Sequence, residues 1–99
     1  MSSPAGPFTV HFSAAVAEQI RRVLQRAGQA GRNEQALAAY YSALVGMETN
    51  PEDFGEPLYR LPALRLQIRC AVVPPLIIHF GVAEDRPVVY VKGVESLSE

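Results

Sequence analysis

The chain has 99 residues, is 48% apolar and carries a net charge of −1 from nine basic and ten acidic side chains. This length suits one domain with its own core, and the near-zero charge excludes a protein that coats nucleic acid nonspecifically, because that affinity comes from many Lys and Arg contacts to phosphates. The single cysteine, Cys70, excludes an internal disulfide framework and a multi-cysteine zinc site.

The residues at the N-terminus, MSSPAGPFTVHF, lack the basic and apolar regions of a secretory signal. No apolar run approaches the roughly 20 residues of a membrane span. We therefore expect a cytoplasmic protein that has no membrane partner. The two histidines, His11 and His79, have no neighbours at metal-ligand spacing, so we expect no metal and no cofactor.

Residues 1–7 contain two prolines, a glycine and two serines, which predicts a flexible arm ahead of a single domain over residues 8–99. From Phe8 to Phe12, apolar residues alternate with Thr and His, which is the period of a half-buried strand. Ser13 stands where this pattern ends, and its hydroxyl can cap the helix that follows.

Two helices are predicted next. In the first, apolar residues recur at helical spacing from Ala14 until Gly28 and Gly31 end the pattern. Asn33 can cap the second helix, and Asn50-Pro51 stops it. The second helix has a predicted apolar stripe of Leu37, Tyr40, Tyr41, Leu44 and Met47. Since each helix has one apolar face, both must pack against a third surface.

The second half of the chain predicts a sheet. Pro62 cannot donate a ladder hydrogen bond, so residues 58–61 are predicted as an irregular or edge segment, with regular pairing from about Leu64. Pro74-Pro75 separates this strand from the next, and residues 83–87 form the loop before a last strand over Val88 to Val94. The order βααβββ predicts an α+β fold with a helix hairpin packed on one face of a mainly antiparallel four-stranded sheet.

Period-2 alternation predicts which side chains share a face. If Leu66, Ile68 and Cys70 lie beneath the helices, Arg65, Gln67 and Arg69 lie on the opposite, uncovered face. Guanidinium groups hold phosphate, histidine changes charge near neutral pH, and tyrosine stacks on bases. The predicted RNA- or anion-binding residues are Arg60, Arg65, Arg69, His79, Tyr90 and Lys92. The alternative is a solvated face, which is polar in any antiparallel sheet.

The element order, the chain length and the segments FTVHFS, NPEDFGEPLYRL and LRLQIR resemble the RelE/ParE superfamily of toxins from bacterial toxin–antitoxin pairs, from about Phe8 to Val94. The resemblance implies the RelE/ParE-like fold, an antitoxin that wraps over the domain, and a target that is either messenger RNA on the ribosome or DNA gyrase. Ribonuclease members use Lys and Arg on the central strands with a His or Tyr near the C-terminus. Here arginines occupy the matching strands without a paired lysine, and the chain ends in SLSE, so no catalytic residue is assigned.

Two hypotheses follow for function. In the first, the chain is a toxin component that binds an antitoxin and RNA through its exposed sheet face. In the alternative, it is a noncatalytic protein-interaction module that keeps the toxin fold without toxin activity. Ile77 and Val94 are expected on the uncovered face, where they would suit an antitoxin segment or a second copy of the chain in a homodimer. Arg21, Arg22 and Arg26 form either a solvated helix face or a contact for an acidic partner.

Overall fold

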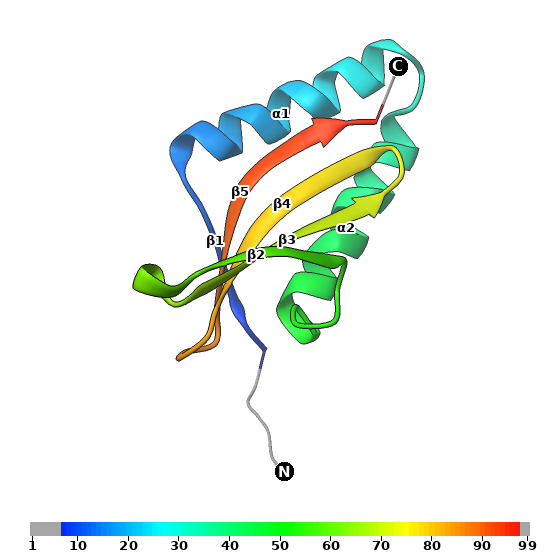
Figure 1. Cartoon of the computed structure of the whole chain (residues 1–99). Coiled ribbons are helices and arrows are strands. Elements are labelled where there is room, and N and C mark those ends of the chain that lie inside the picture. Colours follow the sequence, from blue (N-terminus) through cyan, green and yellow to red (C-terminus); the bar gives the residue numbers. More distant parts are fainter. Residues whose placement is uncertain (1–6, 98–99) are drawn as a thin grey trace.

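The computed structural model describes residues 7–97, so the predicted arm lies outside the described residues except for Pro7. Two helices and a five-stranded sheet make up this part of the chain (Figure 1), which confirms the α+β class. The elements are β1 (Thr9–Phe12), α1 (Ala14–Gln29), α2 (Asn33–Thr49), β2 (Glu56–Leu61), β3 (Leu66–Val73), β4 (Leu76–Ala83) and β5 (Val88–Ser96), with a short 3-10 helix at Pro62–Leu64.

The strand order is β1-β5-β4-β3-β2, and the sheet is mixed because β1 runs parallel to β5 while the other pairs are antiparallel. The predicted four-stranded sheet was wrong by one strand. The segment before Pro62, which was predicted as irregular or edge, is an edge strand, β2. It pairs with β3, and the register of this pairing shifts once, between Pro57 and Tyr59. The 3-10 helix then delays the start of β3 to Leu66.

Helix α1 begins as predicted, since the Val16 amide donates a 3.1 Å hydrogen bond to the Ser13 hydroxyl. It continues through Gly28, and the turn after it contains Gly31 in the left-handed region at φ 76°. The Arg32 amide donates a 2.7 Å hydrogen bond to the Ala27 carbonyl, which closes this turn. Helix α2 therefore has Arg32 at its N-cap position, and the predicted Asn33 cap was wrong.

Helix α2 packs on the sheet through small residues. Ala36, Ala39 and Ala43 are buried together with Met47, and Tyr40 and Leu44 pack against the same cluster. Because this stripe follows the alanines, Tyr41 falls on the outside of the helix and is 61% exposed. Its predicted place in the core was wrong. Val45 is also exposed on this outer surface.

The core lies between the helices and one face of the sheet. From the sheet it takes Leu76, Ile78, Phe80, Val82, Val89, Val91 and Val94, which pack with Val16 and Ile20 of α1. The expected exposure of Val94 was wrong, because β5 has an extra residue opposite the step from His79 to Phe80. This bulge at Lys92 reverses the alternation, so Val94 returns to the core side.

The predicted parity of β3 was also wrong. Arg69 pairs with Phe80 across the strands, which places Arg69 on the helix side, whereas Cys70 pairs with His79 on the opposite face. The Arg69 side chain is 8% exposed, and it donates from Nε to the Phe54 carbonyl and from Nη2 to the Gly55 carbonyl, each at 2.9 Å. These hydrogen bonds allow a guanidinium to occupy the buried face.

Strand β1 ends at Phe12 opposite Val91, so the last residues of β5 have no strand beside them on that edge. Helix α1 covers part of this gap, where the Val94 amide donates a 2.7 Å hydrogen bond to Gln19 Oε1.

Over residues 7–97, neither helix combines the length and apolar character needed to cross a membrane. The same residues contain no group of three or more His, Cys, Asp or Glu side chains that could hold a metal ion.

Candidate binding face

The sheet face that points away from the helices is called the open face here, and in Figure 1 it is seen with α2 behind the sheet. Cross-strand pairing sets a row of residues across it, which runs His11, Tyr90, Gly81, Ile68 and Tyr59. Gly81 has no side chain, so the side chain of Ile68 packs over it in this row. A Cβ at Gly81 would lie only 3.1 Å from Ile68 Cδ1. Ile68 is therefore almost fully buried although it lies outside the helix-facing core.

Beside this row is a pocket of about 320 Å³ around His79 and Lys92. Strand β2 supplies Leu58 and Tyr59 to its wall, and both side chains are about half exposed. Glu95 lies in the same lining and brings a negative charge next to Lys92. The pocket therefore combines one cation, one anion, a histidine and apolar surface, rather than a concentration of positive charge.

Tyr90 lies on the open face in a small aromatic group. Its ring stacks on His11 with centroids 5.6 Å apart. Arg86 Nη2 donates to the Tyr90 hydroxyl at 2.9 Å, and the pKa of Arg86 is raised mainly by this hydrogen bond. Arg86 also contacts Asp85 at 2.8 Å. The tyrosine ring is thus held between a histidine and an arginine that already has a carboxylate partner.

Three of the predicted site residues lie elsewhere. Arg60 donates from Nη2 to Glu84 Oε1 at 2.8 Å, and this hydrogen-bonded pair lowers the pKa of Glu84 and raises that of Arg60. Arg65 is exposed in the turn before β3 at φ 53°, where its carbonyl accepts from the Glu84 amide. Arg69 is buried on the helix side of the sheet, beneath the loop between α2 and β2. The structure thus places His79 and Lys92 in one pocket and Tyr90 nearby on the same face, while the three arginines are separate.

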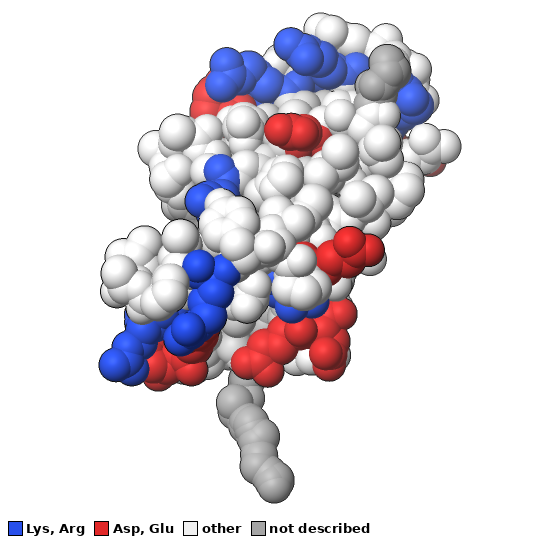
Figure 2. Space-filling view, viewed as in Figure 1, with Lys and Arg blue, Asp and Glu red and all other residues white. Residues whose placement is uncertain are grey.

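The charge distribution agrees with this separation. Figure 2 shows that the middle of the open face is mostly uncharged. Basic side chains gather along α1 at one end, and groups of both signs gather at the opposite end of the sheet. The six predicted RNA- or anion-binding residues therefore do not lie together on the open face, because Arg69 is buried on the helix side.

Several residues of this face were not predicted. Leu58 and Tyr59 were missed because the irregularity next to Pro57 hides the alternation of β2. Glu95 was missed because β5 extends to Ser96, beyond the predicted end at Val94. His11 could have been assigned, since the alternation of β1 already separates it from Val10 and Phe12.

Cys70 lies on the open face beside His79 and is partly exposed. Burial raises the pKa of its thiol, and the charges of Glu56 and Glu95 raise it further. Because the thiolate is the reactive form, iodoacetamide should alkylate Cys70 of the folded chain more slowly at neutral pH than the same cysteine in denaturant, and the rate should climb as the pH rises past the range of an ordinary thiol. Equal rates in the folded and denatured chain at neutral pH would contradict this prediction.

No protein-family model matches the sequence, and no curated protein matches it. Among solved structures, the chain is similar to a chain in the crystal structure of the toxin-antitoxin complex RelBE2 from Mycobacterium tuberculosis, with a TM-score of 0.69 and 16% sequence identity. The similarity covers 99% of this chain and 100% of that chain. At this identity the similarity establishes the fold alone, and the fold agrees with the one that the resemblance to the RelE/ParE superfamily implied.

Proposed function

We propose that this chain is the toxin-like component of a toxin–antitoxin pair and that its open face binds the antitoxin. The observation that carries the proposal is the match of the whole described fold to a chain of a toxin-antitoxin complex. The chemistry of the open face supports it independently, because that face offers apolar surface with few free charges, as protein-binding surfaces do.

The apolar surface is made by three side chains from neighbouring strands. Leu58, Tyr59 and Val72 are 50%, 51% and 57% exposed. Ile77, which pairs with Val72, continues the same surface and is partly exposed. Aromatic and aliphatic groups next to a pocket are typical anchors for a bound protein segment.

RNA binding is the second candidate function. It is favoured by the shared pocket of His79, Lys92 and Tyr59, which offers a cation and a ring that could stack on a base. However, Glu95 offsets Lys92 in that pocket, and Arg69 is committed to backbone carbonyls. Phosphate binding depends on an excess of positive charge, so we place a protein partner ahead of RNA.

A matched pair of variants tests the proposed function. Val72→Asp places a charge on the open face, whereas Val45→Asp does so on the outer surface of α2, where the valine is 56% exposed. We expect Val72→Asp to weaken binding to the protein encoded by the adjoining reading frame about tenfold or more, because a buried unpaired charge is costly at an interface, and Val45→Asp to change it little. Calorimetric titration of the purified proteins measures this difference.

Two further measurements and one contrary outcome of the calorimetric titration complete the test. Growth arrest on expression of the chain alone, relieved by the partner, supports a toxin role, whereas partner binding without arrest supports the noncatalytic interaction module. If Val45→Asp weakens binding as much as Val72→Asp, the open face is not the partner site. Titration with a short single-stranded RNA at low salt decides the second candidate, since loss of binding on Lys92→Ala would favour RNA.

A further inference from the structure

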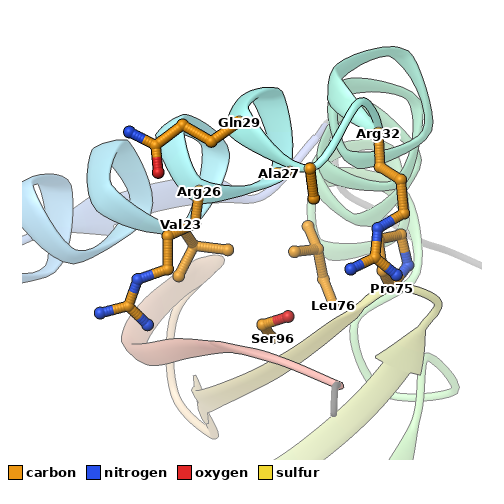
Figure 3. A pocket seen from close by; sticks show the side chains of 9 residues that line it. Val23, Arg26, Ala27, Gln29, Arg32, Pro75, Leu76 and Ser96 are labelled. Carbon is orange, nitrogen blue, oxygen red and sulfur yellow. The ribbon is translucent and has the colours of Figure 1, made fainter.

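A second hollow lies between α1 and the ends of β4 and β5. It consists of two adjoining cavities of about 470 and 420 Å³ that share Val23, Arg26 and Ser96. We call it the arginine groove, because Arg22, Arg26 and Arg32 line it. In Figure 3, Arg26 and Arg32 stand on either side of Leu76 and Ser96, with the helix above them.

The floor of the arginine groove is apolar and its rim is basic. Val23 and Ala27 of α1 and Leu76 of β4 form its apolar lining, which is called the floor here. Helical spacing places Arg22 and Arg26 one turn apart on the same side of α1. The backbone turn after α1 carries Arg32 at the far end. A ligand in this groove would therefore meet apolar contacts in the middle and guanidinium groups on either side of them.

The three groove arginines differ from their neighbour Arg21 in their ion pairing within residues 7–97. Arg21, which is next to them in sequence, pairs with Glu18 at 3.0 Å. Within residues 7–97, Arg22, Arg26 and Arg32 have no such ion pair. Glu95 is the one acidic side chain in the groove lining described by the structure. The groove therefore has an excess of positive charge in a protein whose net charge is −1.

Two features favour a peptide over a nucleic acid in this groove. Among residues 7–97, the lining contains no aromatic ring on which a base could stack, and stacking is the usual way to hold single-stranded RNA. The groove also follows the end of β5, where β1 no longer provides a neighbouring strand. An extended polypeptide lying between α1 and the end of β5 directs alternate side chains to the two sides of the groove.

We infer that the arginine groove binds an extended acidic segment of a partner protein, with Asp or Glu side chains on the three arginines and alternating apolar side chains on the floor. From Gln19 to Arg32 the helix and turn span about 20 Å, which corresponds to about six extended residues. The groove shares only Gln19 and Glu95 with the open-face pocket. The inference is therefore separate from the proposed function and can fail without it.

The test uses a fluorescent peptide of about ten residues in which Asp and Glu alternate with Ala and Val. A second peptide carries Asn and Gln in place of the acids. The groove variant is Arg22→Gln/Arg26→Gln/Arg32→Gln. Its control, Arg21→Gln/Arg60→Gln/Arg86→Gln, loses the same charge from arginines that already have carboxylate partners. Circular dichroism verifies that both variants are folded before fluorescence anisotropy measures binding.

We expect the acidic peptide to bind the unmodified chain, the neutral peptide to bind about tenfold more weakly, and the groove variant to lose about tenfold in affinity while the control stays within about twofold. Binding should also weaken as salt is added. An equal loss in the control would show general charge attraction and overturn the inference. It would also be overturned by failure of the acidic peptide to bind at low salt, or by binding of a short single-stranded RNA in its place with the same dependence on the groove arginines.

Discussion

Replacing Gly55 with alanine should lower the free energy of unfolding by about 3 kcal/mol. Gly55 has φ 75°, and a Cβ at this position would collide with the Cys70 carbonyl oxygen and lie 2.9 Å from the Ala71 Cβ. The obstacle is the backbone of β3, which cannot move aside without breaking the pairing of that strand. Urea unfolding followed by circular dichroism measures the change.

Gly31→Ala is the matched control for this prediction. Gly31 has nearly the same backbone conformation at φ 76°, but nothing lies within 4 Å of the position of a Cβ there. Only the conformational cost of the left-handed region remains, and we expect about 1 kcal/mol. If the two variants were destabilised equally, the close approach of the α2–β2 loop to β3 would not contribute to stability.

The second large effect is expected for Arg69→Met, which should lower the free energy of unfolding by about 2 kcal/mol. Methionine retains most of the side-chain length and the apolar contacts. It removes both hydrogen bonds to the Phe54 and Gly55 carbonyls. The loop between α2 and β2 would lose its attachment to β3, so its amides should also exchange faster with solvent.

Arg65→Asn serves as the comparison for Arg69→Met. Arg65 is exposed and lies at φ 53°, a conformation that asparagine tolerates better than most residues. We expect a change within about 0.5 kcal/mol. A similar loss of stability in both variants would indicate a general effect of removing positive charge. It would exclude a specific role for the guanidinium of Arg69.

The sequence predicted local features well. The Ser13 cap, the helix breaks around Gly31 and Pro51 and the 83–87 loop each depend on residues close together in the chain, and the structure contains them all. The parallel pairing of β1 with β5 could not be predicted in this way. It joins segments from opposite ends of the chain, and neither strand carries a pattern that specifies its neighbour.

The candidate site was predicted less well because polarity was equated with exposure. Arg69 was expected on the open face since arginine is rarely buried, but the loop carbonyls satisfy its donors. Ile68 was expected under the helices, but its side chain lies on the open face, where it packs over Gly81. His79 was placed correctly because β4 has a regular alternation without a competing polar anchor.

The pairing of β1 with β5 also sets an order of events during synthesis. Thr9 is made well before its partner Val88, which follows only after both helices and three further strands. At about 5 to 20 residues per second, several seconds separate the two, and during that time β1 has no strand to join. The helices and the β2–β3–β4 meander can form meanwhile from near neighbours. Completion of the sheet therefore awaits the synthesis of β5, and the apolar side chains of β1 are open to chaperones until then.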